Sequence, residues 1–278
     1  MSDFNYQKIF HPTDLTRGDE AAFAHALKIA HQAKSLLTIF HLDTFDEDAG
    51  WEEFPHVRNL LERWGVIPQG STPQAVLDSG VQVKKIEAKG SAPVHPILHY
   101  LETHKNELIV LSTHQRQGLS RWTHEAIAEP VGRESHVATL FVPRRAVGFV
   151  SVETGAVSLE NILIPIDRKP HPQRAIDAAV ALARILDCPK VNFQLLHVGS
   201  KATCPNVAVP LQTGWQVQEI IKEGDAVETI LDEEEFAYAD LLVMATEGHK
   251  GFLDALRGST TERVLRGSQC PLLAVPAV

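Results

Sequence analysis

The chain has 278 residues, 44% of them apolar and 22% charged, which is typical of a globular protein large enough for two domains. A net charge of −9 and three cysteines without a CxxC spacing argue against a dedicated nucleic-acid binder, a disulfide framework and a zinc knuckle. No apolar run approaches the roughly 20 residues that cross a bilayer, and the N-terminus lacks an export signal, so we expect a cytoplasmic protein with neither nucleic-acid nor membrane partners.

In chain order, the first informative segment is KIFHPTDLT at 8–16, which returns as NILIPIDRK at 161–169. Residues 108–143 align without a gap on 241–276, with 11 identities in 36 positions where average composition gives roughly 2. The offset falls from 153 to 133 between the two alignments, so the first half carries 20 extra residues. They fall within 44–80, where WEEFPHVRNLLERWG predicts an added helix.

We therefore predict two copies of one domain, over residues 1–146 and 159–278, joined by a linker at 147–158. The linker has neither a helical nor a strand period and contains Gly148 and Gly155.

The second copy is predicted to alternate strands and helices. Its strands read as continuous apolar runs, which indicates a parallel sheet buried on both faces, with ligands at the C-terminal ends of the strands. The fold class is therefore α/β, with an open parallel sheet in each copy. The predicted strands are 161–166, 191–198, 215–221, 240–245 and 272–276, and the predicted helices are 171–187, 225–239 and 261–267.

An aspartate follows the first strand of each copy, Asp14 in the first and Asp167 in the second. A carboxylate in this place can accept hydrogen bonds from a ribose hydroxyl or an adenine amine. The alternative is a turn or N-cap residue that introduces the next helix.

A glycine-containing loop follows a later strand of the second copy and leads into a helix that begins near Ser259. Gly248 and Gly251 allow close approach of the backbone, and Gly258 places free N–H groups at the helix N-terminus. Such donors can hold a polyphosphate. The alternative is a loop that only reverses the chain before an ordinary capped helix.

As a spaced set, these motifs resemble those of the universal stress protein family. The family's nucleotide signature is Gly, two residues, Gly, nine residues, Gly and then Ser or Thr after an apolar strand. Here Gly248, Gly258 and Ser259 match it, whereas Ala245 stands for the leading glycine. The segments that also match are IPID ending at Asp167, LLHV at 195–198, GDAVETIL at 224–231 and CPLLAVP at 270–276.

The resemblance covers nearly the whole chain, twice, and implies an adenine-nucleotide-binding-like, Rossmann-like sandwich in each copy. It further implies ATP, with or without Mg²⁺, in the C-terminal copy only. Asp167 and Val198 would flank adenosine, Met244 and the turn after it would back the ribose and phosphates, and the start of the last helix would hold phosphate oxygens. The candidate cofactor-binding residues are Pro165, Ile166, Asp167, Val198, Met244, Ala245, Gly248, His249, Gly258, Ser259 and Thr260.

The first copy departs further from the signature, since its matching positions hold Ser112, Gln115, Glu125 and Ala126. Glu125 introduces charge of the wrong sign for a phosphate, and Ala126 removes the hydroxyl. We predict that this copy does not bind ATP in the family's manner.

Two other patterns suggest sites. His95 and His99 could share a helix face near His104 and bind a metal, but Pro96 between them disturbs the start of the helix, and solvated surface histidines are the alternative. The acidic run at 232–235 is predicted to be the exposed face of a helix, with a partner-binding surface as the alternative.

No nucleophile is paired with a base, so no catalytic residue is predicted. The leading hypothesis is a stress-response protein that binds ATP as a regulatory ligand. The resemblance implies that strands 140–143 and 272–276 pair the two copies edge to edge, and it leaves a further homodimer open. Two other hypotheses remain: a slow ATPase, and a scaffold that binds no nucleotide.

Overall fold

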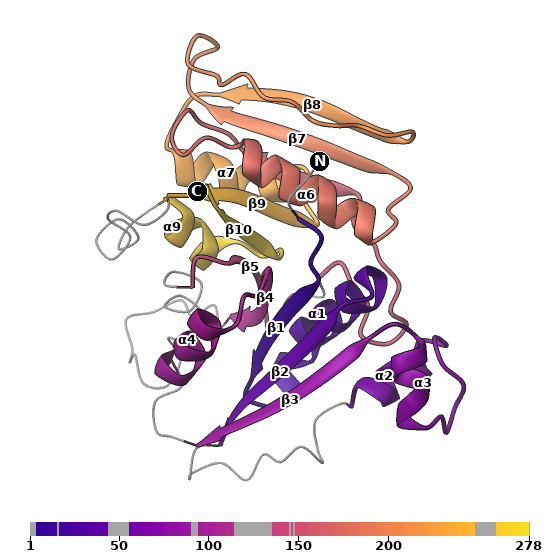
Figure 1. Ribbon diagram of the computed structural model, residues 1–278. Coiled ribbons are helices and arrows are strands. Elements are labelled where there is room, and N and C mark those ends of the chain that lie inside the picture. Colours follow the sequence, from indigo (N-terminus) through magenta and orange to yellow (C-terminus); the bar gives the residue numbers. More distant parts are fainter. Residues whose placement is uncertain are drawn as a thin grey trace.

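The described part of the chain forms one continuous sheet with helices on both faces (Figure 1). The ten strands found in it are ordered β3-β2-β1-β4-β5-β10-β9-β6-β7-β8. Among the described helices, none is long and apolar enough to cross a membrane. The computed structural model describes residues 4–15, 17–43, 56–89, 94–113, 135–144, 146, 148–247 and 260–277.

The N-terminal copy contains the added helix that the sequence predicts, α2, and a second one, α3, that it did not predict. Thr72 and Pro73 begin α3, and Pro fits the first turn of a helix because it needs no amide donor there. The elements are β1 (Lys8–Thr13), the 3₁₀ turn η1 (Arg17–Asp19), α1 (Glu20–Ala33), β2 (Leu36–Asp43), α2 (Val57–Arg63), α3 (Pro73–Asp78), β3 (Gln82–Lys89), α4 (Val94–Thr103), β4 (Leu108–Thr113) and β5 (Ala138–Pro143).

The C-terminal copy shows all eight predicted elements in the predicted order, which confirms the α/β prediction. Between its second and third strands it has an extended segment where the first copy has α2 and α3. The elements are β6 (Asn161–Pro165), α6 (Gln173–Ile185), β7 (Val191–Val198), β8 (Trp215–Lys222), α7 (Ala226–Phe236), β9 (Leu241–Thr246), α9 (Thr260–Gly267) and β10 (Leu272–Pro276).

The two copies meet through the strands that close them. β10 pairs with β5 in the antiparallel direction, with Leu273 opposite Leu140, whereas the other strand pairs of the sheet are parallel. This antiparallel pair lies at the middle of the sheet in Figure 1 and turns two half-sheets into one. The edge-to-edge pairing expected from the resemblance is therefore present within a single chain.

Each central strand is buried on both faces because successive side chains point to opposite sides of the sheet. In β4, Leu108 and Val110 enter a core that contains α1, α2 and α6. Ile109 and Leu111 enter a second core that contains α4, α7 and α9. The absence of polar alternation in these strands is the sequence pattern that predicted a parallel, two-sided sheet.

In each half, pairing of the two central parallel strands stops short of their C-terminal ends. β6 and β9 pair only at Ile162 and Leu163, although β6 continues against β7 as far as Pro165. In the same way, β1 and β4 pair only at Ile9 and Phe10, although β1 continues against β2. The chain order reverses at these points, so each half has a topological switch point, where open α/β sheets bind ligands.

The linker is fastened to the N-terminal copy. His25 of α1 donates from Nδ1 to the carbonyl of Ala21 (2.7 Å), and its Nε2 accepts the main-chain N–H groups of Phe149 (3.0 Å) and Val150 (3.2 Å). Gly148 has a φ of +68°, and a Cβ there would lie 2.3 Å from the His25 ring, so only glycine fits. Burial lowers the pKa of His25 to about 4, which keeps its Nε2 available as an acceptor.

The acidic run on α7 corrects one prediction, since two of its members are buried rather than exposed. Glu234 Oε1 accepts hydrogen bonds from Ser268 Oγ (3.1 Å) and from the main-chain N–H groups of Gln269 (2.7 Å) and Cys270 (2.8 Å). Its neighbour Glu233 forms an ion pair with Lys222. Buried carboxylates need such partners, and the sequence pattern alone does not show them.

Candidate functional site

The C-terminal mouth is the region where β6, β7 and β9 of the second copy end. Asp167 follows β6 and is exposed, and its Oδ1 accepts the main-chain N–H of Arg168 (2.7 Å). Pro172 occupies the N-cap of α6, so Asp167 does not cap that helix. The carboxylate therefore makes a local turn contact and still faces solvent at the switch point.

A buried histidine fixes the ends of β6 and β7, and sequence analysis did not identify it. His197 donates from Nδ1 to the carbonyl of Ile166 (3.0 Å), and its Nε2 lies 2.9 Å from Thr203 Oγ1. The first copy has the equivalent hydrogen bond, in which His41 Nδ1 donates to the carbonyl of Thr13 (3.1 Å). The repetition of a histidine near the end of the second strand was the available signal.

The other predicted residues of this mouth differ in what they can offer a ligand. Ile166 and Met244 are only 4% and 5% exposed and lie in the two cores, so their side chains are not available to a ligand. Ala245 packs its methyl group against the first core. Pro165 and Val198 are half-buried.

The expected phosphate loop is described only at its two ends. Glu247 is exposed directly after β9, and Thr260 is exposed at the first position of α9. Glu262, in the first turn of α9, is ion-paired with Arg266. The predicted residues Gly248, His249, Gly258 and Ser259 lie outside the described residues, as do Gln115, Glu125 and Ala126 of the first copy.

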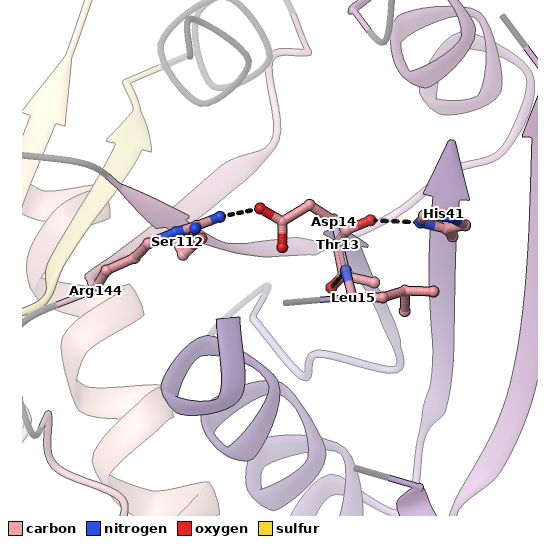
Figure 2. Close-up of polar contacts among 6 residues, drawn as sticks. All are labelled: Thr13, Asp14, Leu15, His41, Ser112 and Arg144. Carbon is pink, nitrogen blue, oxygen red and sulfur yellow. Dashed lines mark hydrogen bonds and ion pairs between the residues drawn. The ribbon is translucent and has the colours of Figure 1, made fainter. Parts of the chain in front are cut away.

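The N-terminal mouth, where β1, β2 and β4 end, has a different content (Figure 2). Arg144 follows β5, and its Nε donates to Ser112 Oγ on β4 (3.2 Å). Its Nη2 forms an ion pair with the carboxylate of Asp14, which follows β1. The two charged side chains are 20% and 35% exposed. The aspartate at this switch point is thus engaged by a cation from its own chain.

The two mouths share a main-chain frame, which makes them directly comparable. The N–H of Arg144 donates to the carbonyl of Thr113 (3.0 Å), and the N–H of Ala277 donates to the carbonyl of Thr246 (2.9 Å). These pairs stand at the offset of 133 residues that relates the copies. At the position of the arginine, the C-terminal copy carries only a methyl group.

Metal-ligand chemistry is not evident in the described residues, where no group of three His, Cys, Asp or Glu side chains comes together. His95 and His99 lie on α4, and His104, just after it, stacks on Tyr100 with ring centroids 4.0 Å apart. Among the described residues of the C-terminal mouth, Asp167 offers an exposed carboxylate and His197 is already hydrogen-bonded. This arrangement suits binding through oxygen acceptors and main-chain groups.

Comparisons with known proteins agree with the repeat. The sequence model described as Universal stress protein family matches residues 5–143 and 158–276. A universal stress protein of Synechocystis sp. is 30% identical over 154 residues, which are 48% of this chain and 95% of the relative. A second, of Methanocaldococcus jannaschii, is 25% identical over 151 residues, 45% of this chain and 86% of the relative.

A solved structure shows the same fold over the full length. The crystal structure of a universal stress protein from Archaeoglobus fulgidus aligns with a TM-score of 0.64 at 16% identity, and the alignment covers 99% of this chain and 100% of that one. The tandem arrangement of two α/β copies is therefore shared with a protein of distant sequence.

Proposed function

This chain is a tandem member of the universal stress protein family, and on that premise we propose that it is a cytoplasmic stress-response protein whose C-terminal copy binds an adenine nucleotide, ATP, as a regulatory ligand. The observation that carries the proposal is the exposed carboxylate of Asp167 at an open switch point. The first copy, by contrast, has its aspartate engaged by Arg144.

The geometry of the described residues supports this assignment. Asp167 can accept hydrogen bonds from the hydroxyl or amine groups of a nucleoside. Ala245 and Ala277 place small, partly buried side chains along the same strand ends, and Ala245 is packed against the first core. His197 joins the ends of β6 and β7 by its hydrogen bond to the carbonyl of Ile166, the residue before Asp167. Preorganised acceptors lower the entropic cost of binding.

A bound nucleotide regulates only if it favours one conformation over another. By the family resemblance we expect the phosphates between β9 and α9, and we propose that ATP acts there by favouring one conformation of the protein over another. Thr260, the first residue of α9, contributes its hydroxyl and the free N–H groups of the helix start. ATP, with Mg²⁺ to balance the phosphate charge beside Glu247, is the ligand to test.

Calorimetry with ATP and Mg²⁺ on the full chain tests the proposal. We expect one site per chain, and we expect Asp167→Asn to weaken binding by about tenfold or more, as for the loss of a hydrogen bond to a charged group. Asp232→Asn is the matched control, because Asp232 is exposed on α7 away from the mouth.

The alternatives give different results. A scaffold shows no heat of binding and no thermal stabilisation, whereas a ligand at 100 times its Kd stabilises the fold by about 2.7 kcal/mol. An ATPase releases phosphate at a rate that falls in Asp167→Asn. Two equal sites per chain would contradict the assignment to the C-terminal copy. Light scattering tests the associated expectation of a homodimer.

A further inference from the structure

The switch point of the N-terminal copy is bridged by one side chain. Arg144 starts beyond the end of β5, donates to Ser112 on β4, and reaches Asp14 at the end of β1 (Figure 2). It therefore spans the place where β1 and β4 have stopped pairing. In the C-terminal copy, the residue at the position of Arg144 is Ala277, and Asp167 is exposed.

The arginine is seated as part of the fold. Its main-chain N–H donates to the carbonyl of Thr113, so the main chain of Arg144 is attached to the end of β4. A Cβ added at Gly18, in the turn before α1, would lie 2.8 Å from Nη1 and 2.9 Å from Cδ of Arg144. The turn and the side chain are therefore in close contact, and any residue larger than glycine would displace one of them.

The contact has a chemical consequence for ligands. Hydrogen bonds from a guanidinium to a carboxylate are about twice as strong as those between neutral groups. A hydroxyl or amine of a nucleoside would also donate to the charged carboxylate of Asp14, but Arg144 adds the attraction of a full positive charge and already occupies that carboxylate, so a nucleoside has to displace it. The cation performs at this mouth the donor role that a nucleoside would perform at the other.

We propose that the N-terminal mouth is a nucleoside site held closed by Arg144, and that removing this side chain opens it. The inference rests on the proposed function, from which it takes the class of ligand. The ligand is a nucleoside without phosphates, since the first copy lacks the residues of the phosphate signature. Arg144 is thus the residue that limits the chain to one ligand.

The repeat supplies a reciprocal test. Ala277 stands on the same main-chain frame as Arg144, and Ala245 stands at the position of Ser112. The double substitution Ala245→Ser with Ala277→Arg builds the closing contact into the C-terminal mouth. We expect it to weaken adenosine binding there at least tenfold, whereas Ala277→Leu, which adds bulk without charge, has a smaller effect.

Calorimetry with adenosine on the full chain measures both the opening of the N-terminal mouth and the closing of the C-terminal one. The native protein should bind one adenosine, Arg144→Ala two, and the variant that combines Arg144→Ala with Asp14→Asn one. Arg63→Ala is the matched control, because Arg63 is an exposed arginine with an ion pair to Glu153 at 3.7 Å, and it should bind one. Circular dichroism checks that each variant is folded.

The outcomes separate this inference from the proposed function. One adenosine in both the native protein and folded Arg144→Ala overturns the inference and leaves the function intact. None in the native protein but one in Arg144→Ala overturns the function and supports the inference. None in either overturns both. If Arg144→Ala does not fold, the C-terminal double variant decides, and unchanged adenosine affinity in it overturns the inference.

Discussion

Each of the two mouths has an aspartate after its first strand and the same main-chain hydrogen bonds at its strand ends. The mouths differ in the side chain that lies beside the aspartate. In the N-terminal mouth, Asp14 is ion-paired with Arg144, which is held between β4 and the turn before α1. In the C-terminal mouth, Asp167 is exposed and Ala277 takes the place of the arginine. Both histidine contacts behind the aspartates are retained.

The difference shows how two copies of one domain can keep the same fold and present different charged groups at the ends of their strands. The strand ends, the switch point and the buried histidine belong to the sheet and are kept in both copies. The residue after the last strand is not needed for the sheet, so it is free to change. At this mouth, Arg144 brings its own charge and pairs with the carboxylate that, on the proposed function, a ligand uses in the other copy.

The largest expected effect is on stability and concerns Glu234, the buried carboxylate of the C-terminal copy. Glu234→Ala should lower the free energy of unfolding by about 4 kcal/mol, because three donors lose their shared acceptor in a buried place. In the first copy, the position 133 residues earlier is Leu101, which cannot accept these hydrogen bonds. Urea denaturation measures the change, and hydrogen exchange should place it in α9 and β10.

Glu235→Ala is the control for this experiment, since Glu235 is the next residue on α7 and is exposed. It should change the stability by less than about 0.5 kcal/mol. Equal effects of the two substitutions would show that the buried network contributes nothing.

The next effect is a loss of stability at acidic pH, and it arises from His25 in the N-terminal copy. His25 has a folded pKa of about 4 against 6.5 when unfolded, so between these values the unfolded chain binds more protons. Its contribution to stability is therefore complete above pH 6.5 and is lost as the pH falls toward 4, by on the order of 3 kcal/mol. The matching residue of the other copy is Ala178, which does not titrate.

Urea denaturation at several pH values tests the His25 prediction. His25→Gln should be less stable at neutral pH because it cannot reproduce both acceptor bonds to the linker. It should also lose the part of the pH dependence that His25 supplies. An unchanged slope between pH 6.5 and 4 in this variant would assign the acid sensitivity to other groups.

The smallest effect is the ion pair that closes the N-terminal mouth. A double-mutant cycle of Asp14→Asn and Arg144→Ala should give a coupling of about 1 kcal/mol, since both side chains are partly exposed to solvent. The same cycle on Arg63 and Glu153, a more exposed pair, should give a coupling near zero. Equal couplings would mean that Arg144 is an ordinary surface contact.

Much of this architecture could be predicted from local sequence. The strand patterns of the second copy predicted each of its strands, and the 133-residue repeat predicted the duplication. Both signals can be read along the chain because they do not depend on which residues are in contact. The burial of Glu233 and Glu234 could not be predicted, since their helix carries four acidic residues in a row and only packing shows which ones face the core.

By itself, the sequence determined the fold class, the tandem repeat and the two aspartates at the strand ends, because these depend on patterns along the chain. Only the tertiary structure decided what each aspartate meets. Asp14 and Arg144 are separated by 130 residues, and their contact arises because β1, β4 and β5 bring their ends to one edge of the sheet. A contact of that range leaves no periodic pattern in the sequence, since it depends on the direction of a single side chain.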